Sequence, residues 1–255
     1  MRNIYSIWKR EIYVYFTSPI AYVVLTAFLV LSGYIFYSSV AFFANISLQA
    51  SQMEYAGDIN VTEIVLKPTF RNISVFMLMM MPIITMKFFA EEKKTGTLEL
   101  ILSYPIREVE LLMGKFAAAF TIFLAMISLT GFYPALLYKY AAPDTGTVIT
   151  GYIGLFLLGG SFTAMGLMFS SFTENQIVAA AGSFGALLIF WLLGWCETFV
   201  GSGWGSLLAH VSFLKHFDNF SKGIVDTRDI VYYLNLTILF LFITVRSLES
   251  KRWQR

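Results

Sequence analysis

The chain has 255 residues, of which 57% are hydrophobic and only 13% are charged, whereas soluble domains carry about 25% charged residues. This composition argues against an ordinary soluble enzyme, and also against a disordered chain, which would combine low hydrophobicity with high charge. The single cysteine, Cys196, excludes a disulfide-stapled domain. A formal net charge of +2 gives no sign of a nucleic-acid partner. We therefore expect an all-α polytopic membrane protein embedded in the lipid bilayer.

Six apolar stretches are long enough to cross a bilayer, for which a helix needs about 20 mainly apolar residues. They are continuous apolar runs rather than segments of alternating hydrophobicity, so they predict helices and not the strands of a membrane barrel. Together they form one transmembrane domain over residues 1–255, with spans at about residues 20–44, 72–90, 114–138, 148–172, 177–198 and 230–247.

Lysine and arginine residues are about twice as numerous on the side that would hold both termini as on the opposite side. Because basic residues collect in cytoplasmic loops, we place both termini in the cytoplasm, together with the loop between the second and third spans. The outer loop at 199–229 is also basic, which weakens this bias. The first apolar run is longer than the core of a signal peptide and no A-x-A site follows it, so we expect it to be a retained span.

The residues before the first span show an amphipathic pattern. Apolar side chains recur there at helical spacing, at Ile4, Ile7, Trp8, Ile12 and Tyr15. The pattern predicts a helix over residues 1–18 that lies in the cytoplasmic membrane interface, and Ser18-Pro19 predicts a bend into the first span. The alternative is a disordered leader in which this spacing arises by chance.

No Asp, Glu, Lys or Arg lies near the centre of any predicted span. Ion-coupled carriers usually need such groups, so a self-sufficient carrier is disfavoured. Gly114-Lys115 is followed by Phe116 and is not a Walker A motif, and His210 and His216 have no cysteine partner for a zinc site. We expect no catalytic residue, no metal site and no cofactor bound by this chain. If ATP drives it, another subunit must hydrolyse the ATP.

Small residues are concentrated in the fourth and fifth predicted spans. Such residues allow membrane helices to approach one another closely. Close packing serves either the interior of one subunit or an interface between subunits, and the sequence leaves both interpretations open.

The cytoplasmic loop at residues 87–115 carries the most informative pattern. We expect Gly96 to end the helix of the second span, and residues 97–102 to form a short helix. One face of this helix is apolar and consists of Leu98, Ile101 and Leu102, with Glu99 on the other side.

Tyr104-Pro105 ends this short helix, because the residue before a proline avoids the helical conformation. Pro105 then suits the first turn of the next helix. A short apolar face on a stiff helix is suited to docking in a groove of a partner. The alternative is a structured loop that packs on the membrane surface.

These residues resemble the permease subunits of ABC-2 type ABC transporters, especially the short six-span permeases of the gliding-motility type. The run EEKKTGTLE at 91–99 is followed by Leu102, Pro105 and Gly114-Lys115. A second match precedes and enters the sixth span, with Ser212-Phe213, His216-Phe217, residues 220–223, Asp226 and Arg228-Asp229. The resemblance covers essentially the whole chain and implies a single ABC-2 type domain.

The resemblance implies that two permeases pair, as a homodimer or with a related second permease, above cytosolic ATPase subunits that bind ATP and Mg. The loop between spans 2 and 3 would be the coupling helix that docks on the ATPase. Its coupling residues would be Glu91, Glu92, Lys93, Lys94, Thr95, Gly96, Thr97, Leu98, Glu99, Ile101, Leu102 and Pro105. A second, smaller contact would involve Ser171, Thr173, Glu174 and Asn175.

The resemblance further implies an exporter subunit of the bacterial inner membrane that is not itself an enzyme. It relates the loop at 199–229 to small helices that dip into the outer membrane face. Apolar residues at helical spacing agree with such a helix, at Leu207, Leu208, Val211 and Leu214, while an ordinary folded loop is the alternative. The rival functions are a non-transporting membrane scaffold or assembly subunit and an ion-coupled carrier or channel.

Overall fold

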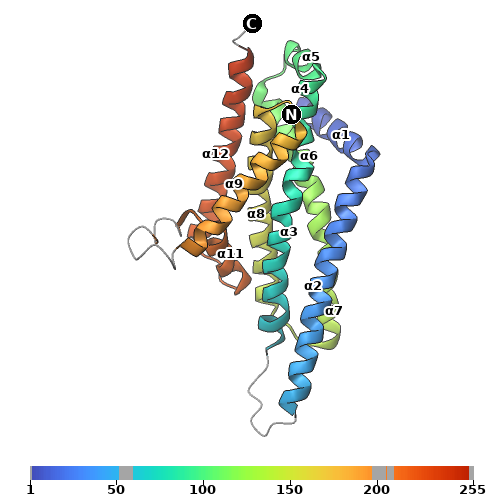
Figure 1. Cartoon of the computed structure of the whole chain (residues 1–255), viewed down its shortest axis with the longest axis vertical. Helices are drawn as coiled ribbons and strands as arrows, with labels where there is room; N and C mark the ends of the chain where they lie inside the picture. Colours follow the sequence, from blue (N-terminus) through green and yellow to red (C-terminus); the bar gives the residue numbers. More distant parts are fainter. Residues whose placement is uncertain (1, 52–59, 197–204, 206–209, 253–255) are drawn as a thin grey trace.

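The computed structural model describes residues 2–51, 60–196, 205 and 210–252, and the regular structure in these ranges is entirely helical. Long helices form an elongated bundle, and the first and last helices both reach the same end of it (Figure 1). Six helical stretches among the described residues are long and apolar enough to cross a membrane. The prediction of an all-α polytopic protein with six spans is therefore confirmed.

The N-terminal helix α1 (Arg2–Thr17) lies across the end of the bundle, whereas α2 (Pro19–Ser51) runs along it (Figure 1). The chain turns at Ser18, as predicted. Part of the apolar side of α1 packs on α6 (Glu108–Thr130), where Ile7 is buried. The indole Nε1 of Trp8 also donates to Thr121 Oγ1 at 3.0 Å. The amphipathic helix is thus present, and contact with α6 takes up part of its apolar face.

The second span begins earlier than the predicted stretch at 72–90. A π-helical turn, η1 (Thr62–Leu66), leads into α3 (Lys67–Thr85) and then α4 (Lys87–Lys94). Charged residues interrupt the apolar run before position 72, which hides this helical start in the sequence. The helix forms there because its apolar residues Val65, Leu66 and Phe70 are buried against the bundle.

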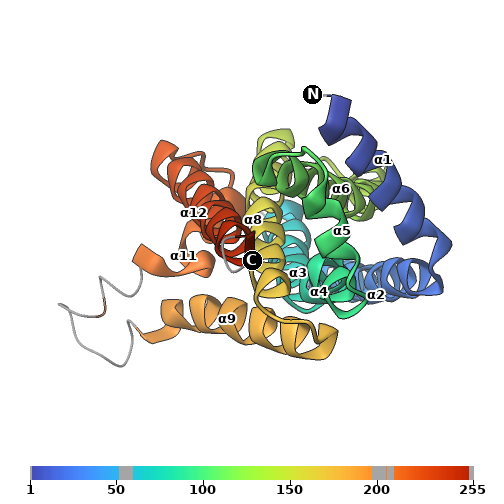
Figure 2. The same ribbon diagram turned by 90° about the horizontal axis from the view of Figure 1, so that it is seen from above.

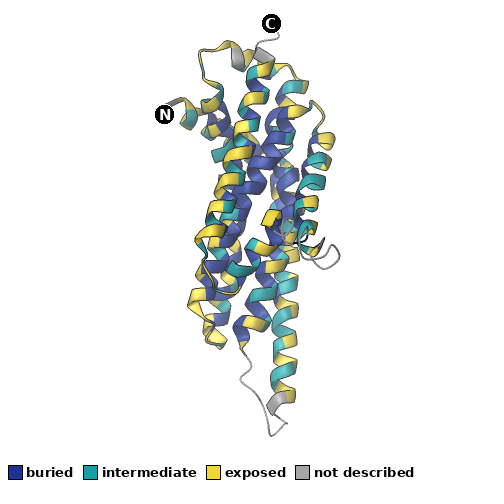
Figure 3. Cartoon of the chain, turned by 90° about the vertical axis from the view of Figure 1, so that its left-hand side faces the viewer, coloured by how far each residue is buried: buried dark blue, intermediate teal, exposed yellow. Residues whose placement is uncertain are grey.

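The remaining spans include the central helix of the bundle. These spans are α6 with α7 (Phe132–Tyr140), α8 (Thr145–Phe172), α9 (Gln176–Cys196) and α12 (Thr227–Arg252). Helix α8 contacts α3, α6, α9 and α12 and lies between them in the view from above (Figure 2). Buried residues accordingly follow the middle of the bundle (Figure 3). The start of α8 is capped by Asp144, whose carboxylate accepts the N–H of Thr147 at 3.0 Å.

The two spans that are rich in small residues have different surroundings. A Cβ added at Gly159 of α8 would lie 2.1 Å from Phe123 Cζ, so this glycine allows α6 and α8 to pack closely. A Cβ added at Gly185 of α9 would meet no atom within 4 Å. Close packing inside one subunit therefore applies to α8 and to part of α9, where a Cβ added at Gly182 would lie 2.8 Å from Phe169 Cδ1, whereas much of the rest of α9 faces outward.

Part of the predicted outer loop at 199–229 forms the short helix α11 (Phe213–Ser221), which packs on α8 and α9. Ser212 caps this helix, because its Oγ accepts the N–H of Leu214 at 3.2 Å. Phe213, Phe217 and Phe220 are buried. Leu207 and Leu208 lie outside the described residues, and entry of this region into the membrane stays a prediction.

Candidate functional site

The predicted coupling loop lies at the same end of the bundle as α1 (Figure 1). Gly96 follows α4 with a φ of 70°, a left-handed conformation that glycine adopts without the strain that a Cβ would add. The chain then forms α5 (Thr97–Ser103), a helix of seven residues. The predicted break at Gly96 and the short helix after it are both confirmed.

Pro105 does not lie in the first turn of the next helix, so this prediction was wrong. Helix α6 begins at Glu108, and Arg107 is its N-cap. The Glu110 carboxylate accepts the backbone N–H of Arg107 at 3.5 Å, a contact that fixes the start of the helix. Residues 104–107 form a turn instead, in which the N–H of Ile106 donates to the Tyr104 carbonyl at 2.7 Å.

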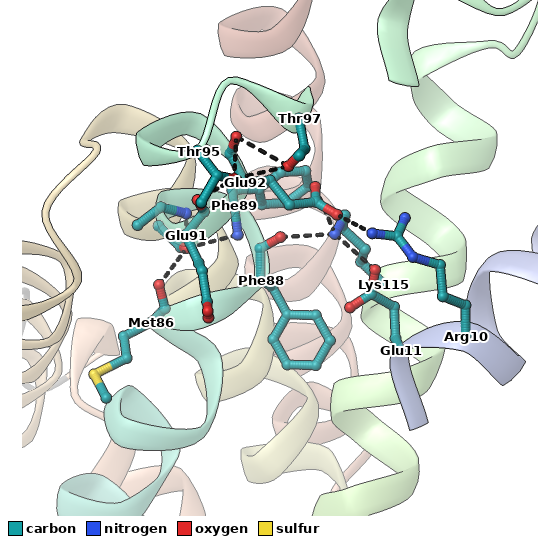
Figure 4. A network of polar contacts seen from close by, with 12 residues as sticks. Arg10, Glu11, Met86, Phe88, Phe89, Glu91, Glu92, Thr95, Thr97 and Lys115 are labelled. Atoms are coloured by element: carbon teal, nitrogen blue, oxygen red, sulfur yellow. Dashed lines mark hydrogen bonds and ion pairs between the residues drawn. The ribbon is translucent and has the colours of Figure 1, made fainter. Parts of the chain in front are cut away.

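A buried ionic cluster holds α4 against α1 and α6 (Figure 4). The fully buried Lys115 of α6 places its Nζ 2.9 Å from Glu11 Oε1 and 2.9 Å from Glu92 Oε2. The same ammonium donates to the Phe88 carbonyl at 2.7 Å, and Arg10 Nη2 lies 3.2 Å from Glu92 Oε1. A buried charge without partners would be very costly. The cluster therefore fixes how α1, α4 and α6 meet.

In the sequence, Lys115 belongs to a Gly-Lys pair that is not a nucleotide-binding motif and to the family pattern. A signal for its burial was nevertheless present, because its helical neighbours on one face are apolar, namely Leu111, Leu112, Ala118, Ala119 and Ile122. Its partners could not be identified in the same way. Glu11 lies 104 positions away in the chain, and only the fold brings it to Lys115.

Polar contacts also join α4 to the end of α8. Ser170 Oγ accepts the N–H groups of Phe89 at 3.0 Å and Ala90 at 3.1 Å, and it donates to the Met86 carbonyl at 2.8 Å. Lys93 Nζ donates to the carbonyl of Ser171, a residue that is itself buried. Helix α4 is therefore held from two sides, by the Lys115 cluster and by the end of α8.

The predicted coupling residues have two different environments. Glu92 and Leu98 are buried within the chain, with exposed fractions of 8% and 3%. The exposed members are Glu91, Lys94, Thr95, Gly96, Glu99 and Pro105, and the half-buried members are Lys93, Thr97 and Ile101. The side chain of Leu102 is outside the described part of the structure. Leu98 packs α5 onto its own bundle, so the outward surface consists of other residues.

Two exposed apolar side chains in and just after α5 were not among the predicted coupling residues. Leu100 and Tyr104 are each 65% exposed. Leu100 lies on the side of α5 opposite to the apolar face predicted from the spacing, and for this reason the pattern did not single it out. Exposed apolar side chains on a short, well-held helix are a feature of protein interaction sites.

The second predicted contact lies at the end of α8, where Ser171 is buried and not available to a partner, and in the link between α8 and α9. Thr173 is half-buried, whereas Glu174 and Asn175 are exposed. Asn175 also has a structural role, because its Oδ1 accepts the N–H of Ile177 at 2.9 Å and so caps α9. Lys94 lines one hollow together with Glu174 and Asn175. The structure thus brings the two predicted contact regions side by side.

Comparison with known proteins agrees with this architecture. A family model described as ABC-2 family transporter protein matches residues 5–252, nearly the whole chain. No curated protein matches the chain. The match is to the family, and the gliding-motility subtype stays a prediction. ABC-2 permeases are multi-pass membrane subunits that work with a separate ATPase subunit. With six helices able to span a membrane and a family match over almost its full length, the chain belongs to the ABC-2 transporter family as a membrane-spanning permease subunit.

Proposed function

We propose that α5 and the α8–α9 link form the surface through which a cytosolic ATPase subunit drives this permease. The observation that carries the proposal is the exposed pair Leu100 and Tyr104 at a helix whose base is held by the Lys115 cluster. A helix with exposed apolar side chains suits a groove in a partner protein. The exposed Glu99 and Lys94 supply polar contacts at its edge.

In this proposal ATP and Mg²⁺ bind to the ATPase subunit and not to this chain. ATP can shift the permease between states only through contacts that differ between those states, and α5 makes those contacts. A displacement of α5 passes to α4 through Gly96. It reaches α1 and α6 through Glu92 and Lys115, which pair at 2.9 Å. Three helices would then respond to one docking event.

The complete transporter in this proposal is an exporter of the bacterial inner membrane, with both termini of the chain in the cytoplasm. Two permeases pair in it, either two copies of this chain or this chain and a related permease. The uncharged span centres favour an apolar or lipid-linked cargo over a small ion.

The docking surface is tested by purifying the tagged permease from native membranes in mild detergent and identifying its partners by mass spectrometry. We expect a stoichiometric soluble protein with a Walker A motif to co-purify with the wild type. Leu100→Glu should reduce its recovery at least about tenfold, because a charge in an apolar groove is strongly disfavoured. Position 100 is preferable to position 98, where a charge would disrupt packing within the chain.

Tyr140→Glu is the matched control, since Tyr140 is 80% exposed and ends α7, a helix that lies far from α5 (Figure 1). This variant should retain the ATPase, and both variants should keep the wild-type melting temperature. Equal ATPase recovery with Leu100→Glu and wild type would contradict the assignment of α5 as the docking helix. Purification of the wild type with no ATPase would favour a membrane scaffold.

A further inference from the structure

A cavity of about 310 Å³ lies between α1, α4 and the start of α5, and we call it the elbow pocket. Its charged lining consists of Arg10, Lys87, Glu11, Glu91 and Glu92, and its polar lining includes Tyr15, Ser18 and Thr97. Its volume is at the lower end of the roughly 300–1,000 Å³ that is usual for small-molecule sites. Arg10, Glu11 and Glu92 belong both to this lining and to the Lys115 cluster, and the proposed docking surface does not use the pocket.

The elbow pocket lies where two spans leave the membrane. Ser18 directly precedes α2, the first span, and Lys87 lies in the last part of the second, which ends at Lys94. A pocket between an amphipathic helix and two span ends is at the depth of lipid headgroups. Phospholipids are therefore present next to it at high local concentration.

Two cations in the elbow pocket have donors available for an anion. Lys87 Nζ donates to Ser18 Oγ at 3.3 Å and forms no ion pair with a carboxylate among the described residues. Arg10 contacts Glu92 through Nη2, and its side chain is 52% exposed. Guanidinium and ammonium groups together are suited to a phosphate, which accepts several charge-assisted hydrogen bonds.

Tyr15 is an independent indication that a ligand is bound here. The residue lines the elbow pocket and is only 7% exposed, and its hydroxyl has no hydrogen-bond partner within the described ranges. Burial raises the pKa of Tyr15 above its ordinary value, so the hydroxyl keeps its proton. A buried hydroxyl without a partner is costly, and a ligand acceptor would remove that cost.

Three carboxylates line the elbow pocket, and those of Glu11 and Glu92 are paired with Lys115. Glu91 is exposed, lines the pocket and forms no ion pair in the part of the chain that the structure describes. We propose that the elbow pocket binds the phosphoethanolamine headgroup of a membrane phospholipid. The phosphate accepts hydrogen bonds from Arg10, Lys87 and the Tyr15 hydroxyl, and the ammonium pairs with Glu91. This proposal does not depend on ATPase docking.

The test is native mass spectrometry of the full-length protein, delipidated in detergent and titrated with phosphatidylethanolamine. Lys87→Met and Tyr15→Phe should each weaken binding at least about threefold, because each removes one donor to the phosphate. The matched controls lie on the same helices, Lys94→Met on α4 and Tyr13→Phe on α1, where Tyr13 is 71% exposed. Neither control should change the affinity, and thermal unfolding should show that all four variants are folded.

Three further titrations identify the headgroup and its source. Phosphatidylglycerol, which lacks the ammonium, should bind more weakly than phosphatidylethanolamine, and Glu91→Gln should remove this difference. Glycerophosphoethanolamine and inorganic phosphate, which lack acyl chains, should bind far more weakly than the lipid. The proposal is overturned if Lys87→Met and Tyr15→Phe bind phosphatidylethanolamine as the wild type does, if phosphatidylglycerol binds equally well, or if inorganic phosphate binds as tightly as the lipid.

Discussion

The segment from α4 to α5 has an inner side and an outer side with opposite properties. On the inner side, Glu92 pairs with Lys115 at 2.9 Å and Leu98 is 3% exposed. On the outer side, only two positions after Leu98, Leu100 is 65% exposed. Residues that hold the fold and residues available to a partner therefore alternate within a few positions. A variant in this segment reports on docking only if it is on the outer side.

Lys115→Met should have the largest effect, on the inner side. The change removes the ammonium from the half-buried Glu11 and from the buried Glu92, which keeps only Arg10 as a partner, and breaking a buried ion pair in this way costs about 3–5 kcal/mol. The measurement is the free energy of unfolding in detergent. Lys94→Met, a change of the same kind at an exposed position of α4, is the control and should be nearly neutral. Equal stability of the two variants would show that the cluster does not hold the fold.

Leu98→Ala should be the next most damaging change. Truncation of a buried leucine costs about 2–5 kcal/mol, and we expect the lower end of this range because a short helix near the surface can relax into the space. Leu100→Ala should leave the unfolding free energy within about 0.5 kcal/mol of the wild type. If both substitutions had the same effect on stability, the inner and outer sides would not differ as described.

Ser170→Ala should have a smaller effect at the contact between α8 and α4. The substitution removes the acceptor for the N–H groups of Phe89 and Ala90, and unsatisfied buried groups cost about 1–3 kcal/mol. Ser103→Ala changes an exposed serine whose Oγ donates within its own helix to the Leu100 carbonyl at 2.7 Å, so it should be almost neutral. Hydrogen exchange of the α4 amides should become faster in Ser170→Ala, because these hydrogen bonds are lost. Amide protection equal to that of the wild type would contradict the prediction that Ser170 holds α4 against α8.

Gly96→Ala should have the smallest effect, at the junction between the two sides. A Cβ there would meet no atom within 4 Å, but φ is +70°, and the left-handed conformation costs an alanine about 1–2 kcal/mol. Gly185→Ala also meets no atom within 4 Å, yet it should be slightly stabilising because alanine favours the interior of a helix. The two changes should shift the melting temperature in opposite directions, and shifts of the same sign would contradict this account.

The sequence determined those features that depend on neighbouring residues. The six spans follow from the length and apolar character of continuous runs, which the bilayer requires of any crossing helix. Gly96 ended a helix at the predicted position because the conformation needed there suits glycine. The family pattern in residues 91–99 is equally local, and the family match over residues 5–252 agrees with it.

The tertiary structure decided which side chains are buried, because burial depends on helices that are distant in the chain. Spacing placed Leu98 on an apolar face, but only the bundle shows that this face is turned inward. Small residues followed the same pattern in the fourth and fifth spans, yet Gly159 faces Phe123 of α6, whereas no atom of the described residues lies within 4 Å of a Cβ added at Gly185. Only the fold brings Lys115 next to Glu11, because two charged residues 104 positions apart form no recognisable pattern in the sequence.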